Sequence, residues 1–417
     1  MDGVPEPGMR TVTEAELSRV LGALPGVPRV LASGNYATPY RLLGLADAAI
    51  AEYRLHMLNA QPGIPDRPGV VYESAFVGPG MRGHPRLRYF PCRLSLVPFL
   101  LRQRLCPDVV LLHTSRPDNR AVSLGVEVNV LPAAVEAARA RGGLVIAQVN
   151  AAMPVTYGDA LLPLEAVDYL LEADEPLLTH AVAAPDAVSA AIGQRVAALV
   201  PPQATLQLGI GAIPDATLRA LLDRRGLRVW SEMFSDGALA LEKAGCLDPD
   251  TPVTASFCFG SAELYDWVDR NPRVRMLRTE KTNDPGTIAS HANLMSINSA
   301  LQVDLFAQAN ATRVGSRTHS GFGGQTDFIV GAMHAPGGHA IIALRSWHPK
   351  ADVSTVVPML AGPVTSFQHS YIVTEQGTAR IWGHDAAEQA QQILDQAAHP
   401  AARDELRATG RELGLPL

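Results

Sequence analysis

The stretch that decides the fold is Leu206-Gln-Leu-Gly-Ile-Gly-Ala-Ile-Pro-Asp215. A short apolar run leads into a tight glycine turn, and Pro214 with Asp215 suits the first turn of a helix. Gly209 and Gly211 free the backbone for close approach, and the turn leaves bare N–H groups at the helix N-terminus. Such N–H groups hold an anion or a developing oxyanion well. The sequence therefore predicts a strand, an anion-binding turn and a helix.

A second short strand follows and ends at a carboxylate. The run from Leu227 to Trp230 is rich in β-forming residues and leads directly to Glu232. Side chains just past the C-terminal end of a strand lie where open α/β sheets bind their ligands. We therefore expect the rest of the chain to hold Glu232 against the glycine turn. The alternative is that Glu232 only caps the helix after it.

Strands and helices alternate along the chain. Leu144 to Asn150 is a continuous apolar strand of the kind that a parallel sheet buries on both faces. Strand, glycine-turn and helix openings recur at residues 29–44 and 206–222. The pattern predicts an α/β fold of two similar open α/β domains, with parallel or mixed sheets flanked by helices and the active site in the cleft between them. Leu294 to Gly338, rich in Asn, Gln, Thr and Gly, is expected to form strands and loops.

Length sets the domain organisation. A chain of 417 residues is too long for one ordinary core, so two domains are expected. An Ala-rich helical run begins at Ala184 and closes at the Pro201-Pro202 pair, which cannot continue a helix. We expect an N-terminal domain at residues 1–190 and a C-terminal domain, which carries the glutamate, at residues 191–417.

Composition excludes several classes of protein. The chain is 47% hydrophobic and 18% charged, with no apolar run long enough to span a bilayer, so no membrane partner is expected. A formal net charge of −6 argues against binding nucleic acid. Without an export signal or metal-type cysteine spacing, we expect reduced thiols and a cytoplasmic location. The four cysteines are Cys92, Cys106, Cys246 and Cys258.

Several motifs in one order identify a family. They are Gly209–Ala216, Ser231–Gly237, Ile297–Leu305, Ser320–Phe328 and Val373–Gly377, with Gln148–Asp159 in the N-terminal half. Together they resemble the acetyl-CoA hydrolase/transferase family, and most closely its 4-hydroxybutyrate CoA-transferase-like branch. The resemblance extends from about Val30 to Gly383. Any single motif, such as G-x-G, would be weak.

By this resemblance Glu232 matches the catalytic glutamate of the family. Its oxygen attacks the acyl carbon of an acyl-CoA and gives a mixed anhydride with release of the CoA thiolate. The thiolate then forms a glutamyl-CoA thioester, and a second carboxylate later collects the CoA. The resemblance thus implies an acyl-CoA:carboxylate CoA-transferase that works by ping-pong transfer.

Glycines are expected around this glutamate, because each attack forms an oxyanion that needs N–H donors. Gly324 matches a family glycine whose backbone N–H has this role. The alternative for its loop is a β-hairpin that needs positive φ angles. The residues expected to line the CoA site are Gly209, Gly211, Gly321, Gly323, Gly324 and Glu375.

Two further residues acquire roles from the family. Asn283 matches an asparagine that orients the catalytic glutamate through a hydrogen bond, although an Asn before Asp-Pro is commonly a turn residue. Glu375 matches a second glutamate near the site, with a structural or substrate-binding role. Two positions depart from the relatives: Trp230 stands where His is common, and Arg120 stands near where glycine is common. A bulky indole beside the glutamate would reshape the acyl pocket.

Histidines crowd the C-terminal half, yet no metal site is expected. No pair has the i, i+4 spacing of a zinc site with a supporting glutamate, and no G-x-S-x-G elbow suggests a Ser-His-Asp hydrolase. His319, beside the second glycine loop, is a candidate substrate contact.

The sequence thus predicts an enzyme that moves CoA between small carboxylic acids through Glu232. CoA is carried as a substrate, with no permanently bound cofactor, and the family implies a homodimer. Two alternatives remain open. An acyl-CoA hydrolase would resolve the same intermediate with water, and a non-catalytic acyl-CoA-binding protein would keep the fold alone.

Overall fold

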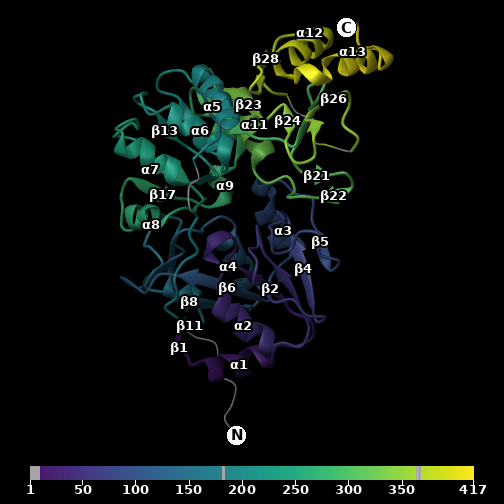
Figure 1. Ribbon diagram of the computed structural model, residues 1–417. Helices are drawn as coiled ribbons and strands as arrows, with labels where there is room; N and C mark the ends of the chain where they lie inside the picture. Colours follow the sequence, from purple (N-terminus) through teal and green to yellow (C-terminus); the bar gives the residue numbers. More distant parts are fainter. Residues whose placement is uncertain (1–9, 181–183, 363, 365–367) are drawn as a thin grey trace. The chain divides into compact units, whose positions relative to one another are not determined.

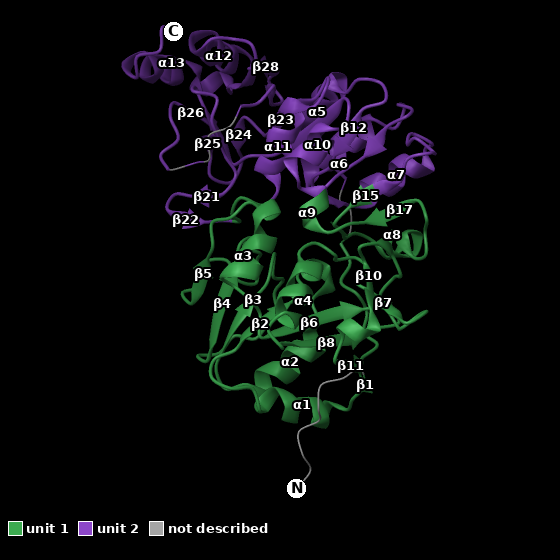
Figure 2. Ribbon diagram, turned by 180° about the vertical axis from the view of Figure 1, so that it is seen from behind, with its two compact units in different colours: residues 1–181, 254–281, 320–323 green, residues 182–253, 282–319, 324–417 purple. Residues whose placement is uncertain are grey.

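The chain forms two compact units, which Figure 2 colours separately. The computed structural model describes residues 10–180, 184–362, 364 and 368–417. Unit 1 comprises residues 1–181, 254–281 and 320–323, and unit 2 comprises residues 182–253, 282–319 and 324–417. Two segments from the C-terminal half therefore belong to unit 1. Nothing in the sequence indicates that these two segments belong to unit 1. The domain boundary expected between residues 190 and 191 stays a prediction.

Unit 1 is built on an eight-stranded sheet in the order β1-β11-β8-β6-β2-β3-β4-β5 (Figure 1). All of its neighbouring strands run parallel. The strands are β1 (Arg10–Thr11), β2 (Arg29–Ala32), β3 (Tyr53–His56), β4 (Val70–Ser74), β5 (Leu87–Tyr89), β6 (Val109–Thr114), β8 (Leu144–Val149) and β11 (Tyr169–Glu172). The two strands expected near residues 29 and 144 are confirmed.

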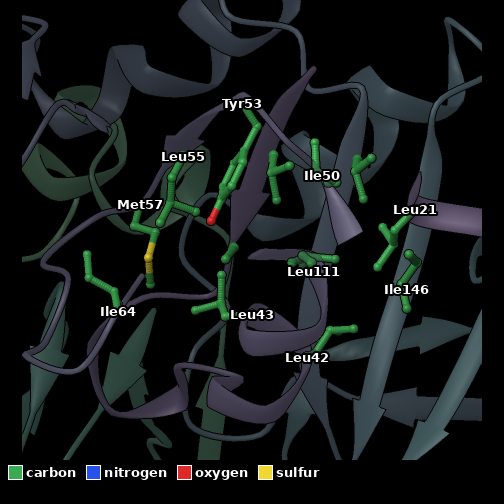
Figure 3. Packing of buried hydrophobic residues seen from close by; sticks show 14 of the residues in the cluster. Leu21, Leu42, Leu43, Ile50, Tyr53, Leu55, Met57, Ile64, Leu111 and Ile146 are labelled. Carbon is green, nitrogen blue, oxygen red and sulfur yellow. The ribbon is translucent and has the colours of Figure 1, made fainter. Parts of the chain in front are cut away.

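Helices α1 (Glu14–Gly22) and α2 (Tyr40–Ala49) pack together against one face of this sheet. Alternate strand residues, among them Tyr53, Leu55 and Leu111, point into the core that the two helices cover (Figure 3). Every residue of β6 is buried, so both faces of the sheet are covered there. The other helices of this unit are α3 (Val97–Gln103), α4 (Leu131–Arg139) and α8 (Ala262–Val268), and α9 (Thr279–Thr282) begins in this unit and ends at the first residue of the next segment of unit 2.

Unit 2 is built on a six-stranded sheet in the order β13-β12-β18-β23-β27-β28. The first five strands run parallel, and β28 pairs antiparallel with β27. The strands are β12 (Thr205–Gln207), β13 (Arg228–Val229), β18 (Leu294–Asn298), β23 (His339–Ala343), β27 (Tyr371–Val373) and β28 (Thr378–Arg380). Parallel and mixed sheets flanked by helices confirm the predicted fold class.

Close packing of two helices sets the position of the glycine turn in unit 2. Helix α6 (Ala212–Ala220) follows this turn and packs on α5 (Ala187–Leu199). A Cβ on Gly193 would lie 2.6 Å from the carbonyl carbon of Ala216, so the two backbones can approach only at a glycine. The remaining helices of this unit are α7 (Asp236–Lys243), α10 (Pro285–Ala289), α11 (Gln325–His334), α12 (Ala386–Gln392) and α13 (Arg403–Glu412).

The region from Leu294 to Gly338 differs from the prediction. It is expected to form strands and loops, yet it contains helix α11 (Gln325–His334). The aromatic and β-branched residues of this segment have low helix propensity. Phe328 and Ile329 are buried in two apolar clusters of unit 2, so packing stabilises a helix that local propensity does not indicate.

Within the described residues, no helix is both long and apolar enough to span a membrane. All four cysteines lie in the described part of the chain and are free thiols. Three of them are buried and Cys92 is half-buried. The cytoplasmic location stays a prediction.

Helix α11 tests how tightly unit 2 is packed. A Cβ on Gly331 would lie 2.3 Å from Cγ2 of Ile288 in α10. We expect Gly331→Ala to lower the free energy of unfolding by about 1 to 3 kcal/mol in urea titrations, because overpacking forces the helices apart. Gly44→Ala is the matched control, since a Cβ there meets open space in α2 and should stabilise by about 0.5 to 1 kcal/mol. Equal effects of the two substitutions would contradict this packing.

Candidate active site

Glu232 lies just past β13, at the carboxyl edge of the parallel sheet of unit 2. Its neighbour Ser231 is fully buried and joins the chain to the end of β12. The Leu208 N–H donates to Oγ of Ser231 over 2.9 Å, and this hydroxyl donates to the Leu208 carbonyl over 3.2 Å. Leu208 also pairs with Met233 in an isolated antiparallel bridge. The glutamate therefore sits beside the strand that leads into the Gly209 turn.

Two residues distant in sequence contact the Glu232 carboxylate. Nδ2 of Asn283 donates a hydrogen bond to Oε2 over 2.9 Å, and the backbone N–H of Gly324 also donates to the carboxylate. A Cβ on Gly324 would lie 1.7 Å from Oε2 and 2.3 Å from Nδ2 of Asn283. Because φ at Gly324 is −95°, glycine is needed here for space and not for backbone conformation. The structure thus brings together three of the residues that the sequence singles out.

The electrostatic surroundings of Glu232 bring the pKa of its carboxyl group close to neutral pH. Glu232 as a whole is half-buried, and burial of its carboxyl group raises the pKa to about 7, with the nearby Asp327 adding to this shift. The hydrogen bonds from Asn283 and the Gly324 N–H act in the opposite direction, because they favour the charged form. Gly324 is the N-cap of α11, whose helix dipole also favours negative charge at this point.

The other predicted glycines have separate structural reasons. Gly211 has φ of +109° and caps α6, and a Cβ on Gly209 would lie 3.3 Å from the Pro214 ring. Gly321 and Gly323 both have positive φ and belong to unit 1. Side chains there would press on the rings of Tyr89 and Phe76 respectively. The predicted CoA-binding role of these four glycines stays a prediction.

Glu375 lies at a different part of the same sheet. It follows β27, and three strands separate β27 from β13 in the strand order. At about 4.8 Å between neighbouring strands, β27 lies roughly 19 Å from β13 across the sheet. Burial would raise the pKa of Glu375, but hydrogen bonds from the hydroxyl and N–H of Ser346 lower it below the ordinary value. A substrate contact of Glu375 stays a prediction.

The two positions that depart from the relatives have different surroundings. Trp230 is half-buried; its indole donates to the Thr282 carbonyl over 3.1 Å and contacts the His291 ring in a tilted arrangement. Arg120 is an exposed residue of unit 1 with φ of +67°, and its guanidinium pairs with Glu165 over 2.9 Å. The indole bond is a feature that sequence reasoning missed, because neither partner belongs to a recognisable motif.

No group of three His, Cys, Asp or Glu side chains that could hold a metal ion occurs in residues 10–180, 184–362, 364 and 368–417. The candidate substrate contact, His319, lies in unit 2, and its backbone N–H donates to the Thr312 carbonyl over 2.8 Å.

A cavity of about 440 Å³ opens at the carboxyl edge of the unit 2 sheet. It is lined by segments that follow β12, β18 and β23, together with the loop that carries Trp347 and Lys350. The N-terminus of α6 and the cationic side chain of Lys350 favour negative charge there, whereas Arg345 already pairs with Asp186. A mixture of apolar, aromatic and cationic groups suits an organic anion.

Comparison with known proteins identifies the family. The acetyl-CoA hydrolase/transferase N-terminal domain matches residues 26–180, and the C-terminal domain of the same family matches residues 260–409. The chain is 39% identical over 333 residues to the 4-hydroxybutyrate coenzyme A transferase of Clostridium kluyveri, which covers 77% of this chain and 76% of that protein.

Solved structures agree with this match. The 4-hydroxybutyrate CoA-transferase from Porphyromonas gingivalis has a TM-score of 0.81 and 30% identity, covering 97% of this chain and 98% of that one. RipA from Yersinia pestis has a TM-score of 0.89 and 28% identity, covering 95% and 97%. The fold and these matches define an enzyme of the CoA-transferase class. The chain belongs to the acetyl-CoA hydrolase/transferase family.

The contact at Gly324 predicts a severe effect of a single methyl group. In Gly324→Ala the new Cβ would overlap Oε2 of Glu232, so the carboxylate must move and lose its backbone donor. We expect kcat/KM for acyl-CoA to fall by at least about a hundredfold, the size seen when one oxyanion donor is lost. Gly83→Ala, where a Cβ meets open space, controls for the loss of a glycine, although its positive φ costs some stability. Wild-type activity in Gly324→Ala would contradict the close approach.

The raised pKa of Glu232 also predicts a pH-dependent stability. The folded protein keeps the carboxyl proton up to about pH 7, whereas the unfolded chain loses it near the ordinary glutamate pKa of 4.5. The contribution of Glu232 to stability therefore falls as the pH rises between these values. Relative to wild type, Glu232→Gln should gain about 1 to 3 kcal/mol between pH 4.5 and pH 8 in urea titrations. A pH-independent difference would show that the carboxyl group is not held protonated by the fold.

Proposed function

We propose that the chain is an acyl-CoA:carboxylate CoA-transferase, which transfers CoA through a glutamyl-CoA thioester on Glu232. The single observation that carries this proposal is the environment of the glutamate. Its carboxylate is partly withdrawn from water, has a pKa near neutrality, and is held by Asn283 and the Gly324 N–H. A carboxylate that only caps a helix needs neither burial nor a side-chain donor from a distant segment.

The proposed reaction proceeds in two balanced halves. The Glu232 carboxylate attacks the acyl carbon, the carbon–sulfur bond breaks, and the CoA thiolate leaves a mixed anhydride behind. The thiolate then attacks the glutamyl carbonyl carbon, which releases the first acid as its carboxylate and leaves glutamyl-CoA. A second carboxylate reverses both steps and departs as the new acyl-CoA. No redox partner or metal is required, because each step exchanges one acyl bond for another.

The charge that develops in each step needs fixed donors. The Gly324 N–H and Nδ2 of Asn283 already point at the carboxylate, so they can follow its negative charge as it moves to an oxyanion. The N-terminus of α11 adds a favourable dipole at the same point. With a pKa near 7, a large fraction of Glu232 is ionised at neutral pH and remains a better nucleophile than a strongly acidic carboxylate.

For the substrate we propose an acyl-CoA with a small acyl group and a small carboxylic acid as acceptor, by analogy with the 4-hydroxybutyrate coenzyme A transferase relative. The cavity lined by Lys350 and the α6 N-terminus is our candidate for part of the CoA binding site. CoA enters as a substrate and leaves as product. Assembly as a homodimer, which the family resemblance implies, remains part of this proposal.

The second candidate function is acyl-CoA hydrolysis, in which water resolves the same thioester. The family name includes both activities, and in this proposal both use the same glutamate. A non-catalytic acyl-CoA-binding protein would need neither the raised pKa nor the donors at Glu232.

An isotope-labelling experiment distinguishes the three candidate functions. The protein is incubated with acetyl-CoA and a labelled carboxylic acid such as butyrate, and thioesters and free acids are separated. Label in a new thioester supports the transferase, and free acetate without labelled thioester supports the hydrolase. Neither product, with acetyl-CoA still bound, supports the binding protein and overturns the proposal. Glu232→Gln should abolish both activities.

A further inference from the structure

An asparagine amide can orient a carboxylate only if its N–H side faces it, because the opposite side is an acceptor. In unit 2 the amide of Asn283 faces Glu232 with Nδ2. Two residues that take no part in the proposed reaction bond to Asn283 or to the peptide group before it. We infer that Thr282 and Trp230 are positioning residues, which fix the orientation of the Asn283 amide toward Glu232.

Thr282 acts on the side chain of its neighbour. Its hydroxyl donates to Oδ1 of Asn283 over 2.8 Å, while Nδ2 on the other side of the amide donates to Glu232 over 2.9 Å. A flipped amide would bring Oδ1 against the carboxylate, which places two acceptors together. Thr282 and Asn283 are both 0% exposed, so water cannot replace the hydroxyl. The ionised carboxylate, which only accepts, selects the orientation with Nδ2 toward Glu232, and the Thr282 hydroxyl then holds the amide there by donating to Oδ1.

Trp230 acts on the backbone of the same segment. Its indole Nε1–H donates to the carbonyl oxygen of Thr282 over 3.1 Å. This carbonyl group and the nitrogen of Asn283 belong to one planar peptide unit, so the bond fixes the plane from which the asparagine projects. Trp230 also lies two residues before Glu232. The segments 230–232 and 282–283 are thus joined by two hydrogen bonds into a closed ring.

The indole is itself held firmly. The ring of His291 contacts Trp230 in a tilted arrangement, with centroids 4.4 Å apart and planes at 35°. The indole also packs on an apolar cluster that includes Ile288, Leu294 and Phe328. These contacts leave the ring few alternative positions. The indole N–H is therefore preorganised toward the Thr282 carbonyl. The large Trp230 side chain in this way helps to orient Asn283 toward Glu232.

This assignment rests on the proposed function, because it requires Glu232 to be the nucleophile. The test measures the single-turnover rate at which CoA becomes attached to the protein from acetyl-CoA, by rapid quench from about pH 5 to about pH 9. Thr282→Val should slow attachment about ten- to hundredfold, because an amide released from Thr282 weakens its own hydrogen bond to the charged Glu232 carboxylate. The acid limb of the pH profile should also move to higher pH, because the Asn283 bond favours the ionised carboxylate.

Two conservative variants refine the test. Thr282→Ser keeps the hydroxyl and should restore the wild-type rate and pH profile. Trp230→Phe keeps an aromatic ring on His291 but removes the N–H, so it should change both measurements in the same direction as Thr282→Val. Thr156→Val is the matched control: this buried threonine of unit 1 donates to the Gly125 carbonyl over 2.7 Å. It should lose stability without a change in rate or pH profile.

A mutant cycle decides whether these residues act through Asn283. In an Asn283→Ala background, Thr282→Val should change the attachment rate by less than about twofold. A tenfold effect in that background would overturn the inference, and so would a wild-type pH profile in Thr282→Val. If the wild-type protein attaches no CoA at all, the proposed function itself fails, which is distinct from failure of the positioning role.

Discussion

The contact between the Glu232 carboxylate and the backbone of Gly324 is the constraint on which the rest of the site depends. The space that a Cβ would occupy is taken by Oε2, which lies 1.7 Å from that position. The carboxylate can therefore reach a backbone N–H at the start of α11 only because this residue has no side chain. Asn283 completes the arrangement from a third segment of unit 2. The absence of a side chain at Gly324 thus allows the end of β13, the loop with Asn283 and the N-terminus of α11 to meet at one carboxylate.

Two opposing effects act on the charge at this point. Partial removal from water disfavours the carboxylate ion and raises its pKa, and the buried Asp327 adds to this effect. The donors and the α11 dipole favour the ion and limit the shift. Together these effects leave the pKa of Glu232 near 7. At neutral pH a large fraction of the side chain is therefore ionised, and this carboxylate is less stabilised, and so more nucleophilic, than a solvated one. The same donors remain in place for the oxyanions, so the site needs little reorganisation during the reaction.

Much of this arrangement is predictable from local sequence patterns. The strand that ends before Glu232 and the glycine turn after β12 follow from short apolar runs next to glycine and proline. The roles of Asn283 and Gly324 come only from family resemblance, because no local pattern joins residues so far apart in sequence. The structure brings both to the carboxylate. Helix α11 is missed because its residues favour other conformations, and burial against two clusters outweighs propensity. The Trp230 bond depends on three-dimensional proximity alone.

The central claim is that the side chain of Glu232 forms a covalent bond to CoA during turnover. The most direct measurement is borohydride reduction of the protein mixed with acetyl-CoA, followed by peptide mapping by mass spectrometry. The account predicts one altered peptide, with the carboxyl group of Glu232 reduced to an alcohol because its thioester was trapped. Reduction at another residue, or an unaltered Glu232 peptide while CoA transfer proceeds, would contradict it.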